Sequence, residues 1–131
     1  SYRKSGNLSN ACVCYEKVLK ASQKKHIPSW IAHAKLALSM LKFQIGEFSF
    51  LMDELDEINK GYEQIGHEWG KLNTRTLKMM AFIKQNGISE DYRQKLQELS
   101  YVAKYMNYRY NLSIIEELLN EQMPYFQLFF L

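Results

Sequence analysis

The sequence predicts an all-α fold built from stacked helix hairpins, on the evidence of three observations. Apolar residues recur at helical spacing along the chain, and strand-like alternation is absent outside the short apolar tail at residues 125–131. Only six glycines and two prolines occur among 131 residues, too few for the turns of a many-stranded sandwich or barrel. Glycines that close predicted helices also recur at a nearly constant spacing. An apolar content of 47% is sufficient for one domain at this length.

The first two helices are predicted at residues 8–25 and 29–45. Proline disrupts a helix interior but suits a first turn, so Pro28 separates the two. One face of the first helix is apolar: Leu8, Ala11, Cys12, Tyr15, Val18 and Leu19. The second helix has two apolar rows, one of Trp30, Ala34, Ala37, Leu38, Leu41 and Ile45, the other of Leu36, Met40 and Phe43. Such a helix is covered on both sides, or is covered on one side and binds a partner with the other.

The third and fourth helices are predicted on either side of Gly66. The third begins at about Glu47, and its outer face is acidic. Its inner face consists of Phe48, Leu51, Leu55, Ile58, Tyr62 and Ile65. The fourth begins near His67 or Glu68 and ends at Asn86 and Gly87, with an inner face of Leu72, Thr76, Met79 and Ile83.

The fifth and sixth helices complete the predicted array. Ser89 is the expected N-cap of the fifth, whose inner face is Tyr92, Leu96, Leu99, Ala103 and Met106. Residues 107–111 are the predicted turn. Leu112, Ile115, Leu118 and Leu119 then begin a sixth helix, which Pro124 closes.

An internal repeat relates these helices to one another. The helix-closing glycines Gly6, Gly46 and Gly87 lie 40 and 41 residues apart. Each precedes a helix whose apolar positions superpose: Ala11, Leu51 and Tyr92; Tyr15, Leu55 and Leu96; Val18, Ile58 and Leu99. A hairpin of this kind cannot bury its apolar face alone, so we expect each hairpin to stack on its neighbours.

The segment from Gly6 to Leu19 resembles the turn and second helix of a tetratricopeptide repeat, with Ala11 as the small residue and Tyr15 as the aromatic. The period of about 40 and residues 62–70 resemble the extended variant found in sensor arms of bacterial signal-transduction ATPases and transcription regulators. Leu51 and Tyr92 depart from the family's small residue. The resemblance implies a right-handed α-solenoid over residues 1–131. Because residues 1–4 look like the end of a helix, we expect a fragment of a longer protein.

In tetratricopeptide arrays the first helix of each hairpin lines a concave groove. The resemblance therefore selects residues 29–45 and 67–86, and the row Leu36, Met40 and Phe43, as a binding surface. The corresponding row in the later helix is Leu77, Ala81 and Lys84, with Lys35, Arg75 and Lys78 as polar neighbours. We expect a protein or peptide partner with an apolar or amphipathic segment. The implied role is a sensor or interaction arm of a cytoplasmic regulatory protein in signalling or transcription.

Two alternatives stay open. All faces of the array could be structural, as in a scaffold segment of a large assembly, with self-association through exposed array ends. Nucleic acid could instead bind the basic row Lys71, Arg75 and Lys78, or a second row at Lys17, Lys20, Lys24 and Lys25. A net charge of only +3 and an acidic third helix do not favour nucleic acid.

Enzymatic, metal and membrane functions have no support in the sequence. His26, His33 and His67 lack the spacing of metal-ligand pairs, and His33 is expected to be a partly exposed helix residue. There is no glycine-rich phosphate loop or nucleophile elbow, so no enzyme activity and no cofactor are expected. No apolar run reaches the length of about 18 residues that spans a membrane. Cys12 and Cys14 are too close on one predicted helix to form a useful disulfide, so we expect a reducing, cytosolic compartment.

Overall fold

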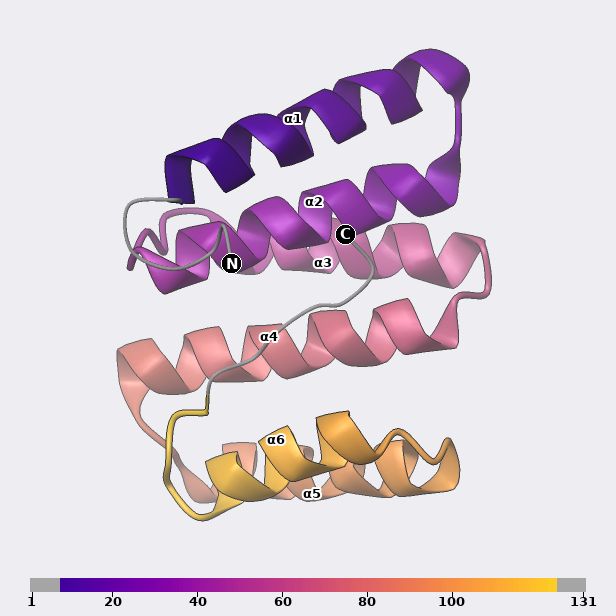
Figure 1. The fold of residues 1–131 in the computed structure, drawn as a ribbon. Coiled ribbons are helices and arrows are strands. Elements are labelled where there is room, and N and C mark those ends of the chain that lie inside the picture. The colour runs from indigo at the N-terminus through magenta and orange to yellow at the C-terminus, as the bar shows by residue number, and fades with distance from the viewer. Residues whose placement is uncertain (1–7, 125–131) are drawn as a thin grey trace.

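The structure, a computed structural model, describes residues 8–124, which form six α-helices and no strand. Figure 1 shows them in succession from α1 at one end to α5 and α6 at the other. The predicted all-α class is therefore confirmed. The helices are α1 (Leu8–Lys25), α2 (Pro28–Gln44), α3 (Leu51–Gln64), α4 (Glu68–Asn86), α5 (Glu90–Tyr105) and α6 (Arg109–Leu119).

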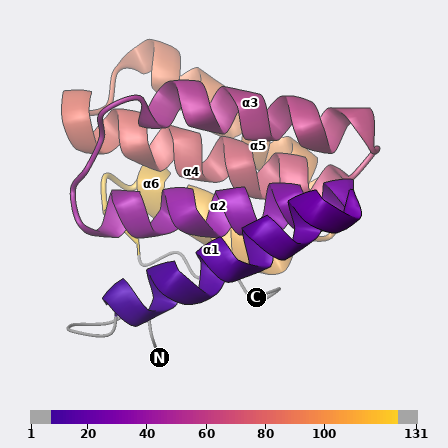
Figure 2. The same ribbon diagram turned by 90° about the horizontal axis from the view of Figure 1, so that it is seen from above.

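Each helix packs on the next one along the chain, as in a helical repeat. The even-numbered helices also touch one another, α2 against α4 and α4 against α6. Within the described residues, no such contact joins α1 to α3 or α3 to α5. The odd-numbered helices are therefore separated, and Figure 2 shows α1 and α3 on opposite sides of α2.

The turns that lead into α2, α4 and α6 share one backbone conformation. His26, Gly66 and Asn107 have positive φ values of 55°, 67° and 59°, and they recur at the predicted spacing of 40 and 41 residues. The next N–H in each turn bonds a carbonyl five residues back, from Ile27, His67 and Tyr108 at 3.0, 2.9 and 2.9 Å. This Schellman geometry satisfies the last carbonyls of the preceding helix. Asn and His adopt a positive φ more readily than most residues, so these turns form at His26 and Asn107 without a glycine.

The pattern of buried residues repeats with the same spacing. Seven buried positions of α2 recur in α4 exactly forty numbers later, beginning with Ala32 and Leu72 and ending with Leu41 and Ala81. In α6 only one face is buried, through Asn111, Ile114, Ile115 and Leu118. Both α2 and α4 are thus covered on two sides, whereas α6 is covered on one.

The hydrophobic core runs through the array between its successive helices. Its main part joins α2 to α6 and includes Leu36, Met40, Tyr62, Leu77 and Leu96. A smaller cluster joins α1 to α2 through Ala11, Tyr15, Ala37 and Leu41. The glycine turns at Gly46 and Gly87 have φ values of 78° and 74°, as expected for helix ends. Gly6 and the apolar tail at 125–131 lie outside the described residues.

Three predicted boundaries were wrong. The third helix starts at Leu51, because the preceding Phe50 has a left-handed φ of 60° and its side chain is 77% exposed. Phe48 packs against the core from the loop before α3, so the apolar spacing begins before the helix does. The sixth helix begins earlier than predicted, at Arg109, and ends at Leu119, well before Pro124.

Three residues assigned to inner faces are exposed. Trp30 and Ile45 on the second helix, and Ile65 after the third, were predicted to be buried. Trp30 lies in the first turn of α2, whereas Ile45 and Ile65 are the C-cap residues of α2 and α3. All three lie at helix ends, where the described residues leave the apolar face exposed.

Candidate functional site

The predicted binding row on the second helix is not accessible. Leu36 and Met40 are 0% and 1% exposed and belong to the main core, and Leu77 and Ala81 of α4 are buried as well. Phe43 is half-buried with its ring centroid 5.9 Å from that of Phe48. Leu36 and Met40 as partner-binding residues are therefore a wrong prediction. The physical reason is that both apolar sides of α2 are covered, one by α1 and the other by the main core.

A groove lies instead between α1 and α3, with α2 as its floor. It forms because α1 and α3 both pack on α2 but do not touch each other (Figure 2). This first groove has a volume of about 840 Å³. Apolar residues and one cysteine from the three helices and their ends line it: Cys12, Leu19, Leu38, Leu41, Ile45 and Ile58. Of the six predicted site residues, only Lys35 lies in its lining.

The first groove continues toward the start of α2. An adjoining hollow of about 290 Å³ shares Lys35, Glu57 and Ile58 with it and extends to Pro28 and Gln64. The two parts together follow α2 from Pro28 to Ile45. At 1.5 Å per residue this is a path of about 25 Å, the length of a helix of about four to five turns.

A smaller second groove occupies the equivalent position one repeat later. It has a volume of about 330 Å³ and is lined by residues of α4 and α5. Arg75, Lys78 and Met79 occupy the positions that Lys35, Leu38 and Ser39 hold in the first groove. Likewise Lys95, Glu98 and Leu99 correspond to Glu54, Glu57 and Ile58. The groove is therefore a feature of the repeat.

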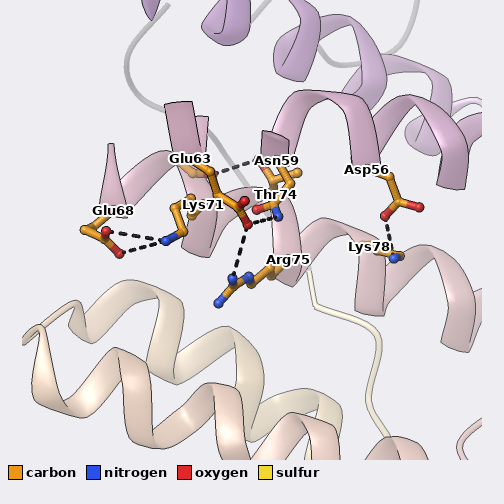
Figure 3. A network of polar contacts seen from close by, with 9 residues as sticks. Asp56, Asn59, Glu63, Glu68, Lys71, Thr74, Arg75 and Lys78 are labelled. Atoms are coloured by element: carbon orange, nitrogen blue, oxygen red, sulfur yellow. Dashed lines mark hydrogen bonds and ion pairs between the residues drawn. The ribbon is translucent and has the colours of Figure 1, made fainter. Parts of the chain in front are cut away.

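Ion pairs between α3 and α4 cross the edge of the second groove (Figure 3). Lys78 pairs with Asp56, and the Nη2 of Arg75 lies 3.9 Å from Glu63 Oε1. One repeat earlier, the residues equivalent to these two pairs are Leu38 with Glu16, and Lys35 with Gln23. Neither combination is an ion pair. The first groove thus has an apolar floor at the position where a lysine of the second groove reaches across to the neighbouring helix.

The same ion pairs bear on the predicted basic row of the fourth helix. Lys71 lies 3.4 Å from Glu68, while Arg75 and Lys78 face the acidic residues of α3 (Figure 3). Carboxylates that already neutralise these cations would have to be displaced before a phosphate could bind. This arrangement does not favour nucleic acid at α4.

Charged groups surround the apolar floor of the first groove. The Nζ of Lys42 bonds both carboxylate oxygens of Glu54, at 2.7 and 2.9 Å, and so connects α2 to α3. The thiol of Cys12 donates a hydrogen bond to Glu16 Oε1 at 3.1 Å. This bond, together with burial, raises the pKa of the Cys12 thiol, which keeps the sulfur protonated and weakly nucleophilic.

A cluster of aromatic rings lies between the N-terminal part of α2 and the turn that joins α3 to α4. The Nδ1 of His33 lies 2.7 Å from the hydroxyl of Tyr62, and the His33 ring packs near His67 at 5.1 Å between centroids. His67 caps α4 by accepting the N–H of Gly70 at 2.9 Å. His33 is only 8% exposed, so the prediction of a partly exposed residue was wrong. Its hydrogen-bond partner, Tyr62, lies on another helix, so the spacing of residues around His33 could not predict the contact.

Burial sets the protonation of this cluster. Burial, with a smaller effect of nearby His67, lowers the pKa of His33 to about 4, and burial raises the pKa of Tyr62. Both groups are therefore neutral at pH 7, which suits a structural hydrogen bond. Over residues 8–124, no three His, Cys, Asp or Glu side chains are placed to hold a metal ion. In the same range no helix is long and apolar enough to cross a membrane.

Comparison of the chain with protein-family models, with curated proteins and with solved structures gave no match.

Proposed function

We propose that this chain is a protein-interaction module, a tetratricopeptide-like right-handed α-solenoid in which the first groove binds an amphipathic helix of a partner. The observation that carries the proposal is the open, apolar floor of the first groove at the position where the second groove has Lys78. An apolar helix face placed on Leu19, Leu38 and Ile45, the lining residues that are partly or fully exposed, would remove them from water. Helix-in-groove binding is a recurring mode of peptide recognition.

The dimensions support a helix as the occupant. A path of about 25 Å accommodates a helix of about 16 residues, whereas a small molecule would leave most of it empty. The walls α1 and α3 leave the floor open along the length of α2. The proposed setting is the sensor or interaction arm of a cytoplasmic regulatory protein in signalling or transcription.

The proposal is tested with a synthetic probe, since binding needs only an apolar stripe of the right length. A fluorescein-labelled peptide of about 16 residues, with leucines at i, i+3, i+4 and i+7 and otherwise Gln and Ala, is titrated by fluorescence polarisation. Saturable binding is expected. Leu38→Gln is expected to weaken it at least tenfold, because about half of a buried leucine's transfer free energy is enough for that factor.

A matched pair of exposed residues provides the control. Ile45 lines the groove and is 56% exposed, whereas Val13 on α1 lies outside it and is 50% exposed. We expect Ile45→Gln to weaken binding severalfold and Val13→Gln to leave it unchanged, with all three variants showing the wild-type circular dichroism spectrum. Absence of binding by the unmodified protein, or equal effects of the two variants, contradicts the proposal. A mass that rises with concentration without peptide would favour the scaffold alternative.

A further inference from the structure

Negative charges outnumber positive charges in the lining of the first groove. Four carboxylates, Glu16, Glu47, Glu54 and Glu57, line it together with two lysines. Glu54 is already neutralised by Lys42. Within the described residues neither Glu47 nor Glu57 forms an ion pair, and Glu16 accepts only the weak hydrogen bond from the Cys12 thiol. Three unpaired carboxylates thus face a single remaining lysine, Lys35.

Comparison between the repeats shows why Glu16 lacks a cation. Its equivalent on α3 is Asp56, which pairs with Lys78 of α4. The residue of α2 at the lysine position is Leu38. The first groove therefore has the acidic member of the pair, whereas an apolar floor residue stands at the position of the basic member.

The second groove has a different balance. Its lining contains three cations, Arg75, Lys78 and Lys95, each already paired with an acid, and a single carboxylate, Glu98. In particular, Lys95 stands where the first groove has Glu54. The two grooves, at equivalent positions of the repeat, thus differ in charge as well as in size.

Resting on the function proposed above, we infer that the partner helix is basic, with Lys or Arg flanking its apolar stripe where it meets Glu16, Glu47 and Glu57. Such a helix supplies the cations that these carboxylates lack within the chain. An acidic partner would add like charges beside an apolar floor, where water screens them less than at an open surface. Charge complementarity of this kind selects among partners that share the same apolar stripe.

The test uses three synthetic peptides with the same leucine stripe and flanking positions occupied by Lys, Gln or Glu. The expected order of affinity is Lys, then Gln, then Glu, with about a five- to tenfold advantage of the Lys peptide over the Gln peptide at 50 mM salt. That advantage is expected to shrink markedly at 300 mM salt, because the groove carboxylates are solvent-accessible.

Two charge variants assign the effect to the groove. The triple variant Glu16→Gln, Glu47→Gln and Glu57→Gln is expected to bring the Lys peptide to the affinity of the Gln peptide and to leave the Gln peptide unchanged. Glu98→Gln, the equivalent of Glu57 in the second groove, is the matched control and is expected to change neither.

The outcomes separate this inference from the proposed function. If none of the three peptides binds, the groove function itself fails. If all three bind with equal affinity, or if the Glu peptide binds best, the groove function stands and the basic partner is refuted. A Lys preference that survives the triple variant also refutes it, because the preference would then arise outside the three groove carboxylates.

Discussion

Two glycines inside helices are expected to respond in opposite directions to the same substitution. Gly61 of α3 and Gly70 of α4 both have helical φ values, so alanine fits the backbone at either site. A Cβ built on Gly61 meets no heavy atom within 4 Å. A Cβ on Gly70 would lie 2.3 Å from two ring carbons of Tyr62 and 2.6 Å from a third. The contrast isolates packing from helix propensity.

The magnitudes follow from these distances. Replacing glycine by alanine inside a helix stabilises it by about 0.5–1 kcal/mol, which is the whole effect expected for Gly61→Ala. At Gly70 the ring cannot move aside, because Tyr62 is completely buried and its hydroxyl bonds His33 at 2.7 Å. Overpacking costs about 1–3 kcal/mol, and displacement of that hydrogen bond about 1 kcal/mol more. Gly70→Ala is therefore expected to destabilise the fold by about 1–3 kcal/mol net.

Urea denaturation followed by circular dichroism measures both variants, with the change in midpoint interpreted at constant slope. The free energies of unfolding of the two variants should differ by about 2–4 kcal/mol. Removing the obstructing ring tests the cause, since Gly70→Ala should cost much less in a Tyr62→Leu background. If Gly70→Ala is as stable as Gly61→Ala, the close approach of α3 and α4 at this point is wrong.

The remaining predictions concern buried polar groups, the core and the groove. Burial of neutral His33 lowers its pKa to about 4, so its contribution to the free energy of unfolding is complete above the ordinary histidine pKa of 6.5. The free energy of unfolding should fall by about 2–3 kcal/mol as the pH drops from 6.5 to 4. His33→Asn should flatten this pH dependence in urea titrations. Asn111 Nδ2 donates to Asn73 Oδ1 at 2.7 Å in the core, so Asn111→Leu alone should cost about 2–3 kcal/mol, whereas changing both residues to leucine should cost much less in a double-mutant cycle. Met40→Ala should lower the free energy of unfolding by about 2–5 kcal/mol, a loss too large for a surface residue. Leu38→Lys should restore a cation opposite Glu16 and abolish peptide binding without lowering the urea midpoint; retained binding would contradict the role of the apolar floor.

The sequence predicted the helices well because their periodicity is local. Tyr15, Leu55 and Leu96, matched at the repeat spacing, are all buried. The turns were harder to recognise, since one backbone conformation is adopted by His26, Gly66 and Asn107 and only one of these is a glycine. The repeat period of about 40 residues is visible in the sequence through the other turns, those at Gly46 and Gly87.

The candidate site could not be predicted, because it depends on contacts that spacing does not encode. Two apolar rows on α2 indicate that each side is either covered by another helix or binds a partner. The residues themselves do not indicate that the main core buries the row of Leu36 and Met40. The groove arises from the absence of contact between α1 and α3, which no single helix reveals. A comparison of aligned repeats could have found one signal, the replacement of the Lys78 position by Leu38.

That replacement shows how the repeat separates structural positions from functional ones. Positions that are buried in both α2 and α4, such as those of Ala37 and Leu77, contribute to the packing between helices. The positions of Leu38 and Lys78 lie at the same place on the groove floor, yet one is apolar and the other pairs with α3. Packing alone does not require this difference, because both residues leave the backbone in the same arrangement. The groove that lacks the cross-helix lysine retains its acidic rim, and this combination is what a basic amphipathic helix would complement.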